Sequence, residues 1–257
     1  MPIYDIIGKS YAQFRLPDRR IVDYLLSLLQ LPPGSTIADI GAGTGGYSRA
    51  IAERGFFVYA VEPSEVMRSQ AVPHPQVQWF EGYAEAIPLP DNAVDAAICI
   101  LALHHFTDLE AALREMHRVA KGAIAFFTFD SQARNYFWLD DYFPFLWECD
   151  ESSFFSIDYI ISFIEFNFRK TVDIYSFPLP PDLTDLFLAA GWQRPEIYLN
   201  PEIRASMSAF ALTDPQLVET GVQQLEADLI SGKWQEKYRE FIDLAEFDLG
   251  YRVLVVN

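Results

Sequence analysis

Short strand patterns and helical patterns alternate regularly along the first half of this 257-residue sequence. The strand patterns are residues 36–40, 56–61, 77–80, 93–101 and 123–129, and the helical patterns among them are residues 46–54, 64–70 and 108–120. Alternation at this spacing predicts a parallel sheet with helices on both faces. Ligands of such sheets bind beyond the carboxyl ends of the strands. Functional residues are therefore expected directly after each strand.

The first strand runs into a glycine-rich turn, residues 39–46 with the sequence D-I-G-A-G-T-G-G. Such a turn gathers backbone N–H groups at a helix N-terminus, and its glycines let the backbone approach a ligand closely. A nucleotide-like cofactor is expected here. Gly41, Gly43 and Gly46 satisfy the dinucleotide pattern G-x-G-x-x-G. Gly41, Gly43 and Gly45 equally satisfy G-x-G-x-G, so the glycines alone leave the kind of cofactor open.

Other elements flank this region. Asp18 is expected to cap a helix over residues 19–30, and Ser64 to cap the helix that follows the second strand. Gly55 is expected as a C-cap. Beyond residue 130, the patterns predict helices at 157–168, 216–230 and 234–244, and strands at 171–177 and 251–256.

The net charge of −17 makes phosphate backbones and acidic membrane surfaces poor partners for this chain. No apolar run reaches the roughly 18 residues of a membrane span, and no signal peptide is recognised. Cys99 and Cys149 are the only cysteines, which favours reduced thiols in a cytoplasmic protein. The histidines have no Cys or carboxylate at ligand spacing, so no metal site is expected.

Several segments after the strands resemble one family in their order along the chain. Residues 81–95 (E-G-Y-A-E-A-I-P-L-P-D-N-A-V-D) are similar to the "GDAExLPFPDxxFD" run of the UbiE-like, type 11 group of class I S-adenosylmethionine (SAM)-dependent methyltransferases. Residues 102–106 (A-L-H-H-F) lie where that group often carries a His-rich segment, and residues 114–122 resemble its "E-x-x-R-V-L-K-P-G-G" helix and turn. With the G-x-G-x-G turn and Glu62 after the second strand, the resemblance covers residues 36–129.

This resemblance implies an α/β, Rossmann-like class I methyltransferase fold. The sheet would be mostly parallel and seven-stranded, with an antiparallel C-terminal strand and a helical, aromatic cap. Residues 1–130 would form the SAM-binding core with N-terminal helices, and residues 131–170 an aromatic cap over the acceptor site. Residues 171–257 would complete the same domain with strands and a helical insertion.

The resemblance also implies roles for individual residues. Gly41, Gly43 and Gly45 would let the turn pass under the methionine part of SAM, Asp39 would accept a hydrogen bond near its ammonium, and Glu62 would bind the ribose diol. The other cofactor contacts expected are Tyr11, Ala42, Met67, Ala84, Glu85 and Leu101. Simpler readings stay open: Asp39 could cap the turn, Met67 could belong to the core, and Tyr11 could be a packing residue.

One position departs from the family pattern. The family has an Asp after the glycine that corresponds to Gly82, but this sequence has Tyr83 there. The Asp side chain that usually binds the adenine amino group in the family is therefore missing. Glu85 or the backbone near Ala84 would have to replace it.

Methyl transfer is an in-line displacement, for which the protein supplies alignment and a dry pocket. His104 and His105 lie where a base would stand, if the acceptor must lose a proton, although one of them could instead hold its loop. Arg15 could bind an acceptor carboxylate or simply lie at the surface. The products expected are S-adenosyl-L-homocysteine and a small molecule methylated on O, N or C. The alternatives are a SAM-fold binding or regulatory protein without turnover and an NAD(P)-dependent oxidoreductase.

Overall fold

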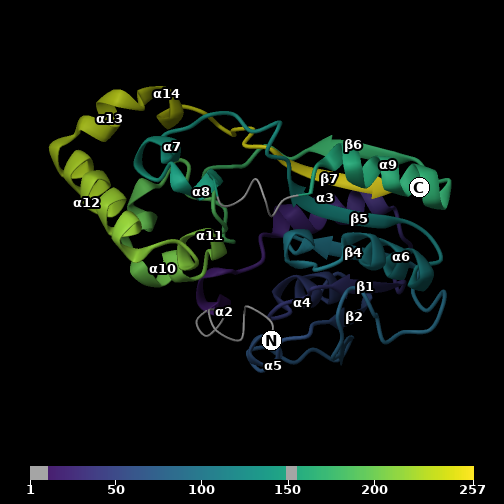
Figure 1. The fold of residues 1–257 in the computed structure, drawn as a ribbon. Helices are drawn as coiled ribbons and strands as arrows, with labels where there is room; N and C mark the ends of the chain where they lie inside the picture. Colours follow the sequence, from purple (N-terminus) through teal and green to yellow (C-terminus); the bar gives the residue numbers. More distant parts are fainter. Residues whose placement is uncertain (1–10, 149–154) are drawn as a thin grey trace.

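The computed structural model describes residues 11–148 and 155–257, and for residues 147 and 148 only the backbone. The expectations for Cys149, for the N-terminal ten residues and for residues 149–154 of the expected cap lie outside this part of the chain. The described residues form two lobes (Figure 1). The sheet lobe holds all seven strands, and the helical lobe holds the short helices of the C-terminal half.

The sheet has the strand order β3-β2-β1-β4-β5-β7-β6. Its strands are β1 (Thr36–Ile40), β2 (Phe57–Val61), β3 (Val77–Phe80), β4 (Ala96–Ile100), β5 (Ile124–Phe129), β6 (Val172–Ser176) and β7 (Tyr251–Val256). β1 to β5 pair in parallel, and β7 lies antiparallel between β5 and β6. The expected seven-stranded sheet with an antiparallel C-terminal strand is therefore confirmed.

Helices cover both faces of this sheet. α3 (Arg19–Leu29) and α4 (Gly46–Ala52) pack on one face, and α6 (Leu109–Val119) and α9 (Ile157–Phe168) pack on the other. β7 shows why both faces are apolar: Val253 and Val255 join the first core, and Leu254 and Val256 join the second. Because successive strand residues point to opposite faces, a strand buried on both sides is expected to be mostly apolar, and the one charged residue of β7, Arg252, pairs with Asp248 at 2.7 Å.

The helix starts follow the sequence closely. The side chains of Asp18, Ser64 and Asp108 accept hydrogen bonds from backbone N–H groups in the first turns of α3, α5 (Glu65–Arg68) and α6. The ends are less well predicted. α4 ends at Ala52 with Glu53 as its C-cap, so the expected helix end at residue 54 and C-cap at Gly55 are wrong.

The helical lobe consists of one helix of 17 residues, α12 (Pro215–Ser231), and several short ones. The short ones are α7 (Leu139–Tyr142), α8 (Phe145–Glu148), α10 (Pro201–Ala205), α11 (Ser208–Ala211), α13 (Lys233–Lys237), α14 (Arg239–Ile242) and the 3-10 helix Pro195–Leu199. The single helix expected at 234–244 is wrong, because the chain breaks at Tyr238 into α13 and α14. α2 (Tyr11–Phe14) is one turn at the N-terminal end of the described chain.

Several aromatic side chains of residues 137–145 pack into the helical lobe. Phe137, Trp138 and Phe143 are fully buried, and the indole N–H of Trp138 donates to the Trp192 carbonyl at 2.6 Å. The remaining described part of 131–170 is mainly α9, which covers the sheet on the opposite side from α3. Packing within the fold therefore explains the buried aromatics, and the expected role of residues 131–170 as a cap over the acceptor stays a prediction.

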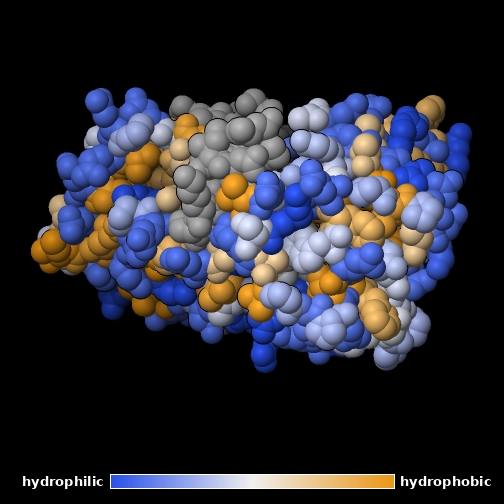
Figure 2. Space-filling model, turned by 90° about the horizontal axis from the view of Figure 1, so that it is seen from below, coloured by the Kyte–Doolittle hydropathy of each residue, from blue (hydrophilic) through white to orange (hydrophobic). Residues whose placement is uncertain are grey.

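Within the described residues, no helix has both the length and the apolar character needed to cross a membrane. Figure 2 shows one face of the molecule, on which hydrophilic side chains predominate and hydrophobic ones are scattered among them.

Candidate active site

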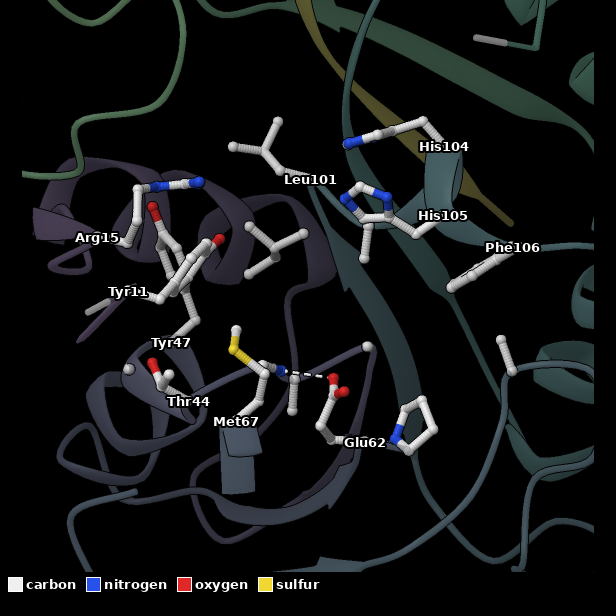
Figure 3. A pocket seen from close by; sticks show the side chains of 18 of the residues that line it. Tyr11, Arg15, Thr44, Tyr47, Glu62, Met67, Leu101, His104, His105 and Phe106 are labelled. Atoms are coloured by element: carbon white, nitrogen blue, oxygen red, sulfur yellow. Dashed lines mark hydrogen bonds between the residues drawn. The ribbon is translucent and has the colours of Figure 1, made fainter. Parts of the chain in front are cut away.

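A cavity of about 510 Å³ lies at the carboxyl ends of β1, β2 and β4 (Figure 3). Its walls come from the glycine turn, from residues following β2 and β4, from residues 83–85, from α2 and Arg15, and from Asp185. Most of the predicted site residues line it: Tyr11, Gly41, Ala42, Gly43, Glu62, Met67, Ala84, Glu85, Leu101, His104 and His105. Asp39 and Gly45 do not.

Two hydrogen bonds hold the glycine turn against β2: the N–H groups of Gly41 and Ala42 both donate to the Val61 carbonyl, at 2.9 and 3.1 Å. Gly45 has a φ of 74°, and a Cβ there would lie 2.4 Å from the ring of Trp79. Its buried position serves packing and the start of α4. The direct cofactor contact expected of Gly45 is therefore not supported.

Asp39 is also buried, with an exposed fraction of 2%, and its Oδ2 accepts a hydrogen bond from the Ser48 hydroxyl at 2.6 Å. Burial raises the pKa of Asp39 to about 6, because it disfavours the charged carboxylate. The hydrogen bond from Ser48 opposes this rise, and the charge of Glu62 adds to it. Asp39 thus joins β1 to α4 beneath the turn, and the hydrogen bond expected of it near the cofactor's ammonium stays a prediction.

Glu62 is oriented before any ligand arrives. Its Oε2 accepts from the N–H of Gly43 and its Oε1 from the N–H of Ser64, both at 2.9 Å. A carboxylate has about four lone-pair positions, so each oxygen can accept a further hydrogen bond. An anchored carboxylate at the end of β2 fits the hydroxyl groups of a ribose.

Glu85 has a second task besides lining the cavity. Its Oε1 accepts from the N–H of Thr107 at 2.7 Å, from the Thr107 hydroxyl at 3.0 Å and from the N–H of Asp108 at 3.2 Å. It therefore holds the turn that leads into α6. Tyr83 and Ala84 also line the cavity beside it, with Tyr83 about half exposed.

Met67 is 2% exposed, and its Cε would lie 3.4 Å from a Cβ built on Gly43. It belongs both to the buried core and to the cavity wall. The two readings of Met67 are thus compatible.

The loop after β4 carries the two histidines. Leu101 has a φ of 51°, a left-handed conformation that costs a residue with a side chain roughly 1–2 kcal/mol. The following 3-10 helix, Leu103–His105, brings the imidazole centroids of His104 and His105 to 3.8 Å from each other. Strain of this kind gathers at functional sites.

The histidines are neutral at pH 7. Burial, and then the charge of Arg15, lowers the pKa of His105 to about 4. Burial, His105 and Arg15 lower the pKa of His104 well below its usual value. A neutral imidazole can accept a proton or a hydrogen bond through one ring nitrogen.

Three lining residues form a network that the sequence did not reveal as such. Arg15 Nε donates to Asp185 Oδ1 at 2.5 Å, and the Tyr47 hydroxyl donates to Asp185 Oδ2 at 2.9 Å. Arg15 thus faces the cavity rather than the surface. Tyr47 and Asp185 were not expected in the site. The partners of the Asp185 carboxylate, Tyr47 and Arg15, precede it by 138 and 170 residues, and no local motif marks such a contact.

Metal ions have no evident place here: among residues 11–148 and 155–257, no three His, Cys, Asp or Glu side chains gather in a way that could hold one.

The sheet order, the glycine turn and the carboxylate after β2 together define the class I SAM-dependent methyltransferases. The family model described as methyltransferase domain, type 11, matches residues 38–127. A solved structure from Anabaena variabilis, of a protein named as a methyltransferase from an antibiotic biosynthesis pathway, is 54% identical to this chain. The match covers 95% of this chain and 99% of that one, with a TM-score of 0.92. The chain therefore belongs to this methyltransferase family.

Curated relatives are more distant. The ubiquinone/menaquinone biosynthesis C-methyltransferase UbiE of Rubrivivax gelatinosus is 34% identical over 46% of this chain and 47% of its own length. The 2-phytyl-1,4-naphtoquinone methyltransferase of Thermosynechococcus vestitus is 27% identical over 77% of this chain and 88% of its own. The chain thus spans only about half the length of UbiE.

Proposed function

We propose that this chain transfers the methyl group of SAM to an O, N or C atom of a small-molecule acceptor by in-line displacement. One observation carries the proposal: a single cavity joins the glycine turn and the anchored Glu62 carboxylate to the histidine pair after β4. The first two features suit the cofactor, and the third lies where a reacting acceptor would need a proton acceptor.

SAM supplies the electrophilic methyl on its sulfonium, and the protein has to align the acceptor and exclude water. Glu62 would bind the ribose hydroxyls, the backbone of Gly41 to Gly43 would lie against the methionine part, and Met67 would pack on the adenine. His104 or His105, being neutral, would accept a proton from an acceptor hydroxyl or amine. The low pKa of His105 makes it a weak base, which suits acceptors that ionise readily.

The acceptor is expected to depend on residues outside the shared domain. The family match ends at residue 127, whereas Asp185 and the helical lobe lie beyond it. The quinone-type acceptor in a relative's name therefore supports a small organic acceptor without specifying it for this chain.

Calorimetric titration with SAM, S-adenosyl-L-homocysteine and NADH tests the cofactor. We expect binding of the first two and none of NADH, and tight NADH binding without a SAM response would refute the proposal. A radiolabelled methyl assay against phenols, amines and carboxylic acids then tests transfer. Binding without transfer to any metabolite pool would support the alternative of a SAM-binding protein without turnover.

We also propose that the chain acts in the cytoplasm on a soluble small molecule and not on nucleic acid or membranes. The net charge of −17 and the buried, free thiol of Cys99 support this. Fractionation of cells expressing the tagged full chain would test the location, with recovery in an oxidising compartment as the contrary result.

A further inference from the structure

Asp185 lies in a segment that joins the two lobes at the cavity. This segment, residues 182–186, follows β6 and runs beside residues 14–20. Arg15 and Asp185 form an antiparallel bridge, and the N–H of Leu186 donates to the Phe14 carbonyl at 3.1 Å. The backbone around both residues is therefore fixed before their side chains meet.

The carboxylate of Asp185 is 1% exposed and is held from two sides. Arg15 donates to it through Nε at 2.5 Å and through Nη2 at 3.5 Å, and Tyr47 donates through its hydroxyl at 2.9 Å. Burial and the charge of Asp185 raise the pKa of Tyr47 well above its usual value, so that the hydroxyl keeps its proton and donates. Because a guanidinium is planar and rigid, contacts along its Nε side set the direction of the whole group.

That direction leads into the cavity. Figure 3 shows the Arg15 side chain reaching across the top of the cavity towards Leu101 and the histidines. The charge of Arg15 is felt there, since it lowers the pKa of both His104 and His105. Among the lining residues that the structure describes, Arg15 is the only Lys or Arg. Arginine is the side chain best suited to recognise a carboxylate in a planar, bidentate manner.

We propose that Asp185 is a positioning residue, which aims the Arg15 guanidinium into the cavity so that Arg15 binds the carboxylate of a ligand. This proposal rests on the proposed function, because it assumes that SAM and an acceptor occupy the cavity. The carboxylate has two possible sources: the amino-acid end of the cofactor or the acceptor itself. Either way, a residue beyond the family domain sets a contact inside the site.

Asp182 provides a matched control for Asp185. It belongs to the same segment and pairs with Arg20 at 2.6 Å, but its side chain is 76% exposed and lies outside the cavity lining. D185N and D182N each remove one carboxylate charge from an Arg–Asp pair. Only D185N should alter the ligand site.

The probes are S-adenosyl-L-homocysteine and methylthioadenosine, which lacks the amino-acid end. If the cofactor supplies the carboxylate, D185N raises the Kd of S-adenosyl-L-homocysteine about tenfold or more and leaves that of methylthioadenosine unchanged. If the acceptor supplies it, both Kd values stay constant, and D185N raises KM about tenfold for carboxylate acceptors only, with kcat less affected. D182N should match the wild type in all of these measurements.

If D185N fails to fold, Y47F offers a milder change, since it removes only the hydroxyl that holds Asp185. The double variant R15K/D185N should bind no worse than R15K, because Asp185 acts through Arg15. Equal Kd and KM values for D185N, Y47F and D182N would overturn the positioning role alone. A wild-type protein that binds no S-adenosyl-L-homocysteine would overturn the proposed function and this inference with it.

Discussion

Gly43 and Gly45 belong to the same turn, but the structure predicts opposite consequences when each is replaced by Ala. Both have a positive φ, 58° and 74°, so each substitution costs roughly 1–2 kcal/mol of folding free energy in backbone strain. The surroundings of the added Cβ then separate them. At Gly45 it would lie 2.4 Å from the Trp79 ring, whereas at Gly43 it would meet only the flexible end of Met67, at 3.4 Å.

Overpacking of the kind expected at Gly45 adds about 1–3 kcal/mol, so G45A should lose about 2–5 kcal/mol of unfolding free energy in total. G43A should lose about 1–2 kcal/mol, the strain alone. Gly34 is the matched control, because it has a φ of 85° and, apart from its chain neighbours, no atom of the described residues lies within 4 Å of an added Cβ. G34A should therefore be about as stable as G43A and clearly more stable than G45A.

Ligand binding should show the reverse order. The Cβ of G43A lies in the cavity wall beside Met67 and next to the N–H that holds Glu62, so we expect at least a tenfold loss of S-adenosyl-L-homocysteine affinity, about 1.4 kcal/mol. G45A and G34A should bind normally under conditions where they are folded.

Urea unfolding followed by tryptophan fluorescence gives the stabilities, provided that the variants share one m value. Calorimetry at a temperature where all three variants are folded gives the affinities. The reasoning is refuted if G45A is as stable as G34A, or if G43A binds S-adenosyl-L-homocysteine as well as the wild type.

Further predictions concern Glu62, Leu101 and the histidines. E62Q should weaken S-adenosyl-L-homocysteine binding in calorimetry by roughly 1.5–3 kcal/mol, the worth of hydrogen bonds to a charged group, and an unchanged Kd would contradict the ribose role. L101G should unfold at a higher urea concentration than L101A, because both lose the packing of the Leu101 side chain but only glycine relieves the backbone strain, about 1 kcal/mol; equal midpoints would contradict the strain argument. The pKa of His105 is lower in the folded than in the unfolded protein, so the unfolded state binds more protons between about pH 6.5 and 4. The contribution of neutral His105 to stability, up to about 3 kcal/mol, is therefore lost as the pH falls through that window. Asp39, whose pKa is raised to about 6 in the folded protein, acts in the opposite sense below pH 6. Its effect cancels when wild type is compared with H105Q, so we expect the difference between their urea midpoints to shrink from pH 8 to 4.

The sheet and the helix starts could be predicted because they depend on neighbouring residues. Short apolar runs between helical patterns predicted β1 to β5, and the side chains of Asp18 and Ser64 cap the helices for which they were expected. The helix end at Ala52 and the break at Tyr238 were missed, because the local patterns of residues 46–54 and 234–244 run past both positions.

The site was predicted in part for the same reason. Glu62 and the histidines follow strands directly, so topology alone brings them together. Asp39 and Gly45 belong to the same motif, but whether such a residue faces the ligand or the core depends on Ser48 and Trp79, which lie outside it. Asp185 was missed because its partner, Arg15, is 170 residues away, and nothing local distinguishes a buried Asp from an exposed one.

The position of β7 has a consequence for the order in which the chain acquires its structure. Within the described sheet, β7 lies between β5 and the edge strand β6, so β6 and one edge of β5 lack their final partner until residues 251–256 have joined the sheet. Until then an apolar strand edge is exposed to association with other chains. The sheet of this methyltransferase therefore closes with contacts of long sequence separation, which slow the final step of folding.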